Sequence, residues 1–305
     1  MTEDKRSVRK AFSRLGVGYA VFLIISLVLQ LVFGTVVGIF SHYGIKIPLG
    51  GWYLMLISLA NYIVGGLAAY FIIQSMPVVS GIRAEKNNKK LLINGFFVCI
   101  SGLYLGNMIG QLLMRGVSAL QGKPMLNPVE QAISGLSTWW IFIIMVVVAP
   151  VFEEILFRKI LVDRVRVYGD RAAIIVSAFI FGLSHGNFYQ FFYAFFLGIV
   201  FAYVYIQTGR LRYTIAYHMI INFIGSIVGL KVQQMPWLIA VYGLLMLSAV
   251  IAGVIIFTKN KKKTAIYDGI YKAWGNSTLK VIFLNFGMIF FFLISAFTFV
   301  ISGIL

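Results

Sequence analysis

Uncharged apolar runs long enough to cross a bilayer dominate this sequence and constrain its fold more than any other feature. The first extends from about Gly16 to Phe40, and similar runs recur to the end of the chain. About 20 apolar residues in a helix span roughly 30 Å of hydrocarbon. Hydrophobic residues make up 60% of the 305 positions and charged residues only 11%, more than a water-soluble core can bury. We therefore expect an all-α, polytopic transmembrane helical bundle.

About nine helices are expected, with eight as the alternative because the fifth and sixth are short. The first run is too long for the apolar core of a cleavable signal peptide, so it is expected to remain as a transmembrane helix. The chain divides into N-terminal helices one to three (1–132), a core of helices four to seven (133–230) and C-terminal helices eight and nine (231–305). The expected helices cover about residues 16–40, 52–73, 91–114, 136–156, 172–185, 191–206, 213–230, 236–257 and 281–305.

Lysine and arginine collect on alternate connections between these helices. Of the 26, 22 lie on one side, and the four on the other side are Lys46, Arg115, Lys123 and Lys231. Basic residues favour the cytoplasmic side, so the N-terminus is expected there and, with nine helices, the C-terminus outside. The net charge of +17 thus reflects membrane topology, and the expected partner is the lipid bilayer and not nucleic acid.

Three glycines at four-residue spacing, Gly102, Gly106 and Gly110, lie on one face of the third expected helix. Small residues at this spacing let another helix approach closely. Packing within the chain is the simpler explanation, and a homodimer is the alternative. The single Cys99 excludes an intrachain disulfide.

Two adjacent glutamates, Glu153 and Glu154, follow a stretch without any charge from Trp139 to Phe152. An ionisable side chain inside a span costs about 2.5–3.5 kcal/mol on insertion scales, so it usually faces a partner within the bundle. Glu154 and Arg158 are four residues apart and share one helix face, whereas Glu153 points about 100° away. The pair is therefore the first candidate for a functional site.

Two of the three histidines fall in the spans that follow. His185 lies near the end of the fifth expected helix, and His218 shares a face of the seventh with Asn222. A single histidine on an apolar face is more often a hydrogen-bonded packing residue. Six polar side chains in consecutive spans, however, are too costly to bury separately. We expect these six to line one water-accessible cavity open towards the cytoplasm: Glu153, Glu154, Arg158, His185, His218 and Asn222.

These residues occur in the order Glu153-Glu154-x-x-x-Arg158, Phe181-x-x-x-His185 and His218-x-x-x-Asn222. The order resembles the three motifs of the CPBP family of intramembrane proteases, which includes CAAX endopeptidases and bacteriocin-processing proteins. The resemblance covers about residues 133–230 and implies an endopeptidase that cleaves near the cytoplasmic membrane face.

The resemblance also implies a role for each residue. Glu153 is the general base that takes a proton from the attacking water, and His185 helps to hold that water. His218 and Asn222 stabilise the oxyanion, and Glu154 with Arg158 orients the site. Amide hydrolysis needs such a proton acceptor and such donors.

No obligatory metal is expected, because the sequence lacks an HExxH motif. If a divalent metal such as zinc is bound, Glu153, His185 and His218 are the three candidate ligands, with a fourth position open for water.

Two other functions remain open. One is a transporter that uses Glu153 and His185 as a proton relay. The other is a non-catalytic scaffold that protects the cell by binding a toxin or an envelope enzyme. A protease would act on a peptide or a membrane-anchored protein, either a CAAX-type tail or a bacteriocin-like precursor. The compact inner connections favour a bacterial plasma membrane.

Overall fold

The computed structural model describes residues 4–79, 89–260, 266–275 and 277–304, and the regular elements in these ranges are helices. Some basic residues that contribute to the orientation prediction lie outside the described residues, namely Arg83, Lys86 and the lysines at 261–263.

Eight helical stretches among the described residues are long and apolar enough to cross a membrane. This confirms an all-α polytopic membrane protein and matches the alternative count. The stretches are Lys5–His42 (α1), Gly51–Ile73 (α2 Gly51–Ala60, η1 Asn61–Gly65, α3 Gly66–Ile73), Lys89–Gln121 (α4), Thr138–Tyr168 (α6 Thr138–Ile141, η2 Phe142–Val148, α7 Ala149–Glu154, η3 Ile155–Ile160, α8 Leu161–Val165, η4 Arg166–Tyr168), Phe188–Thr208 (α10), Leu211–Gln233 (α11 Leu211–Asn222, η5 Phe223–Val228, α12 Gly229–Gln233), Pro236–Asn260 (α13) and Phe286–Gly303, within α16 (Phe286–Ile304).

The fifth expected span is the helix α9 (Asp170–Leu183), which has only 14 residues. At 1.5 Å per residue it extends about 21 Å, less than the thickness of the hydrocarbon layer. It packs closely along α10, where Gly198 lies against Ala178. Eight of the nine expected helices are therefore long enough to cross the membrane, and the fifth is a shorter, buried helix.

The fourth expected helix does not end near Leu156 but continues as a helix to Tyr168. Arg164, expected in the connection after this helix, is buried instead. Arg164 donates hydrogen bonds to the carbonyls of Ile73 and Ile160, at 3.1 and 3.0 Å. A buried arginine is tolerated when its donors are satisfied in this way, and charge alone therefore does not mark the end of this helix.

Short helices occur in the connections: α5 (Pro128–Ile133), α14 (Ile270–Trp274) and α15 (Ser277–Phe283). The segment before α14 is tied to the start of α9, because the Asp170 carboxylate accepts hydrogen bonds from Arg166 at 2.7 Å and from the Tyr267 backbone at 3.2 Å. These contacts fix the depth at which α9 enters the bundle.

The three glycines of α4 face α10 within the same chain. A Cβ at Gly102 would lie 3.0 Å from Cβ of Phe196, and one at Gly106 would overlap the Tyr193 backbone. The close helix approach predicted from their spacing is therefore made inside the chain. Because α10 occupies this face, the face is not free to form a homodimer.

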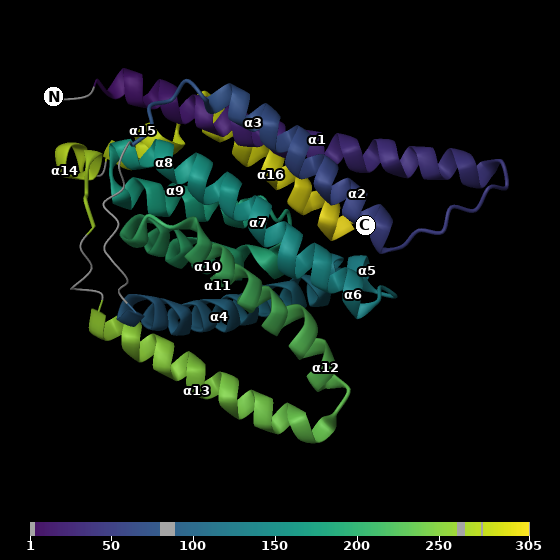
Figure 1. Cartoon of the computed structure of the whole chain (residues 1–305). Helices are drawn as coiled ribbons and strands as arrows, with labels where there is room; N and C mark the ends of the chain where they lie inside the picture. Colours follow the sequence, from purple (N-terminus) through teal and green to yellow (C-terminus); the bar gives the residue numbers. More distant parts are fainter. Residues whose placement is uncertain (1–3, 80–88, 261–265, 276, 305) are drawn as a thin grey trace.

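The tightest packing lies at the end of the bundle that carries the N-terminus, which we call the N-terminal end. There Phe12, Leu15 and Leu161 are fully buried. Towards the other end, which we call the far end, α1 and α13 diverge from the bundle, and Leu31 and Leu244 are 70% and 67% exposed (Figure 1). The C-terminus lies towards the far end, away from the N-terminus (Figure 1).

Candidate functional site

The glutamate pair lies on α7, between the π-helical turns η2 and η3. Pro150 has no N–H for the helical ladder, and its ring crowds the carbonyl four residues earlier. The wider turns on either side of α7 accommodate this disruption and re-aim the residues that follow. π-Helical turns within α-helices are frequent at functional sites.

Glu154 and Arg158 form the fully buried pair that their spacing predicts, with Nε of Arg158 3.1 Å from Oε2 of Glu154. The N–H does not point at this oxygen, so the contact is an ion pair without hydrogen-bond geometry. The guanidinium also lies over the rings of Phe181 and Phe201, at 4.4 and 5.2 Å from their centroids. A desolvated cation gains about 2 kcal/mol from such a ring. The carboxylate and the two rings together hold this charge.

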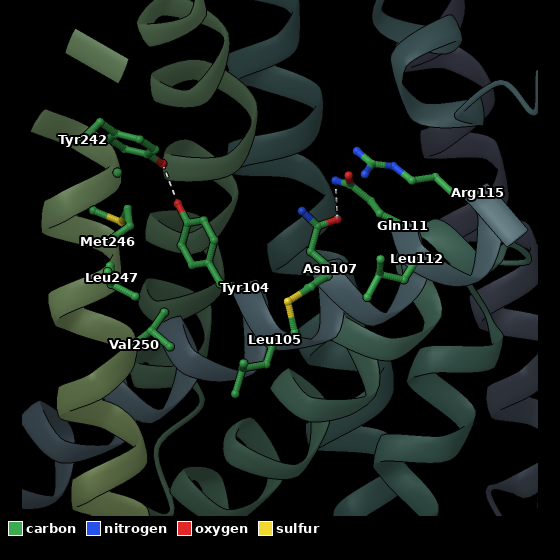
Figure 2. A pocket seen from close by; sticks show the side chains of 12 residues that line it. Tyr104, Leu105, Asn107, Gln111, Leu112, Arg115, Tyr242, Met246, Leu247 and Val250 are labelled. Atoms are coloured by element: carbon green, nitrogen blue, oxygen red, sulfur yellow. Dashed lines mark hydrogen bonds between the residues drawn. The ribbon is translucent and has the colours of Figure 1, made fainter. Parts of the chain in front are cut away.

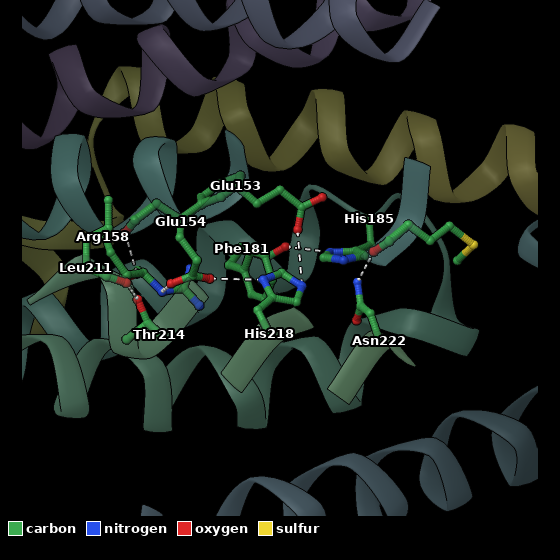
Figure 3. Close-up of polar contacts among 12 residues, drawn as sticks. Glu153, Glu154, Arg158, Phe181, His185, Leu211, Thr214, His218 and Asn222 are labelled. Carbon is green, nitrogen blue, oxygen red and sulfur yellow. Dashed lines mark hydrogen bonds and ion pairs between the residues drawn. The ribbon is translucent and has the colours of Figure 1, made fainter. Parts of the chain in front are cut away.

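His218 joins the two glutamates. Its Nδ1 lies 3.1 Å from Oε1 of Glu154, and its Nε2 lies 3.6 Å from Oε2 of Glu153. The first contact is a hydrogen bond, and the second is slightly longer than one. Figure 3 shows the imidazole between the two carboxylates. Glu153 points away from the Glu154–Arg158 pair on its own helix, but the His218 imidazole from α11 connects it to Glu154.

His185 follows the end of α9 and approaches the same site from another direction. Its Nδ1 donates a hydrogen bond to the Phe181 carbonyl at 2.8 Å, which leaves Nε2 as a free acceptor. Both imidazoles contact the Phe181 ring, at centroid distances of 4.9 Å for His185 and 5.8 Å for His218. The chain reverses at Gly186, whose φ of +67° is a conformation that glycine adopts readily.

Asn222 ends α11 and faces η2. Its side-chain amide donates a hydrogen bond to the Met145 carbonyl at 2.8 Å (Figure 3). One N–H of the amide is thus used to join two helices, and the other is available. The structure therefore brings together the helices that carry all six residues singled out from the sequence.

The comparisons with known proteins concern this same region. A family model described as type II CAAX prenyl endopeptidase Rce1-like matches residues 135–224, which include all six site residues. The UPF0177 protein YbdI of Lactococcus lactis subsp. lactis (strain IL1403) is 32% identical over 127 residues, which cover 39% of this chain and 67% of that protein. The chain belongs to the Rce1-like family. No solved structure matches it.

Membership in the Rce1-like family implies a CAAX-type intramembrane protease that acts on a peptide or protein. With eight helical stretches of membrane-crossing length in its described ranges, the chain is an integral membrane protein. The relative from Lactococcus points to a bacterial source.

Tyr62 lies outside the region matched by the Rce1-like model and was missed in the sequence. It belongs to the π-helical turn η1, and its hydroxyl donates a hydrogen bond to Oε1 of Glu153 at 2.7 Å. Its ring stacks on Phe152, with centroids 5.2 Å apart and planes within 6°. The only available signal was the pair of polar residues Asn61 and Tyr62 inside an apolar run, and that pair says nothing about the partner helix.

A metal site in this Rce1-like chain was expected only conditionally, on Glu153, His185 and His218. Within the described ranges, no three His, Cys, Asp or Glu side chains are arranged to hold a metal ion. His185 keeps a free Nε2, while both nitrogens of His218 face carboxylates. Independence from metal remains a prediction to be tested.

Proposed function

We propose that this chain is an intramembrane endopeptidase in which Glu153 removes a proton from a water molecule that attacks a peptide bond. The observation that carries this proposal is the single imidazole of His218 between the Glu154 and Glu153 carboxylates. Glu154 fixes the orientation of that ring, so that Nε2 points towards the carboxylate oxygen of Glu153. A half-buried, oriented carboxylate beside an oriented imidazole can act as the general base that amide hydrolysis needs.

The two oxygens of Glu153 have different surroundings in this proposal. Tyr62 engages Oε1 at 2.7 Å, while Oε2 faces His218 at 3.6 Å. Oε2 is therefore the oxygen that takes the proton from water, and Tyr62 holds the carboxylate in place. His185 contributes its free Nε2 as an acceptor for the same water.

His218 and Asn222 serve the oxyanion. An imidazole donates from both nitrogens only when it is protonated, so this role needs the imidazolium form of His218. The amide of Asn222 offers the N–H that Met145 leaves free. Each positioned donor of this kind raises kcat by a factor of about 10²–10³.

The substrate is a peptide or membrane-anchored protein, with either a CAAX-type tail or a bacteriocin-like precursor as the class, and cleavage is expected near the cytoplasmic face. Glu153 lies about halfway along the stretch Thr138–Tyr168. The scissile bond must therefore enter the bilayer to reach it. At that depth the segment around the scissile bond must be unwound, because in a helix its carbonyl is already hydrogen-bonded within the helix.

A cleavage assay with the purified protein in liposomes tests the proposal. Glu153→Gln keeps the shape but removes the base, so turnover should be lost while substrate is still retained in a pull-down. Asn222→Ala should lower kcat by about 10²–10³ with little change in KM. Chelator should leave the wild-type rate unchanged. Turnover by Glu153→Gln would place the base elsewhere, with Glu154 as the first alternative.

A further inference from the structure

A second feature of the molecule is a groove between α4 and α13, away from the candidate site. The two helices touch where the Ser101 hydroxyl donates a hydrogen bond to the Val250 carbonyl at 2.8 Å, and Gly253 lies against the same serine. Farther along, Tyr104 and Tyr242 are joined by a 2.6 Å hydrogen bond. Between the helices lies a cavity of about 530 Å³ (Figure 2).

The walls of this groove are mostly apolar. Apart from the paired hydroxyls of Tyr104 and Tyr242, its polar side chains form a single line on α4. Asn107, Gln111 and Arg115 are four residues apart and share one helix face, and Gln111 donates a hydrogen bond to Asn107 at 3.3 Å (Figure 2). The apolar lining side chains are Leu105, Met108, Leu112, Met246, Leu247 and Val250.

Arg115 lies at the depth of a lipid headgroup. Between Lys90 and Arg115 the helix advances about 37 Å, close to the roughly 40 Å between the two headgroup layers of a bilayer. Within the described part of the chain, the Arg115 guanidinium has no hydrogen-bond or ion-pair partner. Arg115 is also one of only four basic residues predicted on its side of the membrane. An unpaired cation above an apolar groove fits a ligand with an anionic head and an acyl chain.

We propose that this groove binds one anionic diacyl phospholipid, of the phosphatidylglycerol type, from the leaflet at the far end. The phosphate accepts hydrogen bonds from Arg115, in the geometry that a guanidinium offers to phosphate. Asn107 and Gln111 bind the ester and glycerol oxygens below it. One acyl chain runs along the roughly 15 Å of helix from Arg115 to Leu105.

Native mass spectrometry of the purified full chain tests this assignment. The probes are phosphatidylglycerol and phosphatidylcholine with identical acyl chains. Wild type should retain phosphatidylglycerol about fivefold more, since a basic residue near a membrane surface contributes about that factor. Arg115→Ala should abolish the preference, whereas the control Lys46→Ala, which changes another basic residue predicted on the same side, should keep it.

A second pair of variants tests the acyl-chain position. Gly243 lines the groove, and a Cβ there would meet nothing within 4 Å. Gly243→Phe should therefore fill the groove without a clash and reduce the binding of both lipids. The matched control is Gly38→Phe on α1, where a Cβ also meets nothing within 4 Å.

Two results would overturn the proposal. One is equal retention of both lipids by wild type, and the other is unchanged retention in Gly243→Phe. Cross-linking with a photoactivatable phosphatidylglycerol keeps the test independent of variant folding. Labelled peptides should include Met108 or Met246, and labelling confined to other helices would also contradict the proposal.

Discussion

Among individual residues, His218 has the most consequential surroundings. It is nearly buried, packs against the rings of Phe181 and Phe201 at 5.8 and 5.3 Å, and presents each nitrogen to a different glutamate. Aromatic walls exclude water and leave the ring few alternative rotamers. The buried pair of Glu154 with Arg158 therefore positions Glu153 indirectly, through this imidazole.

Tyr62→Phe should reduce kcat without reducing folded yield. The lost hydrogen bond to a charged group is worth about 1.5–3 kcal/mol, so the rate should fall about tenfold or more. The matched control is Tyr53→Phe on α2, whose ring contacts Phe33 and Trp52. An unchanged kcat in Tyr62→Phe would remove Tyr62 from the site.

Arg158→Ala should lower folded yield and thermal stability as well as activity. Removing one partner of a buried pair costs about 3–5 kcal/mol, and Arg158 is fully buried. Lys159→Ala is the control, because that side chain is 58% exposed in its pair with Asp163. The double variant Glu154→Gln with Arg158→Met, which removes both charges, should recover most of the stability. Normal stability of Arg158→Ala would instead point to substrate contact.

Among the helices, three of the spans that carry the site depart from regular α-geometry beside it, whereas α9 does not. Glu153 and Glu154 lie between η2 and η3, Asn222 precedes η5, and Tyr62 belongs to η1. A π-helical turn holds one extra residue and so shifts the angular position of everything beyond it. Spacing along a regular helix therefore predicts contacts within one turn, but it does not predict which face of a span meets its neighbour.

The contact between α4 and α10 depends on glycine most strongly at Gly106. Gly106→Leu should lower folded yield and melting temperature, because overpacking costs about 1–3 kcal/mol and the new side chain meets the Tyr193 backbone. Gly116→Leu lies on the same helix, in open space, and should be neutral. A folded Gly106→Leu protein that differed only in oligomeric state would show that Gly106 faces a second copy.

At the scale of the whole molecule, the compact N-terminal end and the open far end differ in how tightly their helices pack. The packed end holds the buried arginines and the start of α9 in place. Towards the far end α13 diverges from α4, and this divergence creates the groove (Figure 1). The candidate site lies between these two regions, where the tightly packed part of the bundle gives way to helices with exposed outer faces.

Thiol labelling in intact cells checks the orientation of the chain. In a Cys99→Ala background, Ser134→Cys at the far end should react with a membrane-impermeant maleimide. Lys10→Cys at the N-terminal end should react only after lysis. Both positions are exposed in the structure. The reverse pattern would mean that the far end faces the cytoplasm and would contradict the orientation inferred from the 26 basic residues.

Much of this protein could be derived from the sequence because the relevant physics is local. Apolar runs of membrane length determine the fold class, and the four-residue spacing of Glu154 and Arg158 determines their pairing. The order of the three motifs indicates the family that the comparisons support. Four-residue glycine spacing likewise predicts a close helix contact, although not which helix makes it.

The tertiary structure decided how the spans meet. The rotation and depth of each helix place Tyr62 against Glu153 and His218 between the two glutamates. They also bury Arg164 against backbone carbonyls and let α9 stop short of a full crossing. Such contacts join residues tens of positions apart, and they depend on side-chain packing between helices. Periodicity within one helix carries no information about that packing.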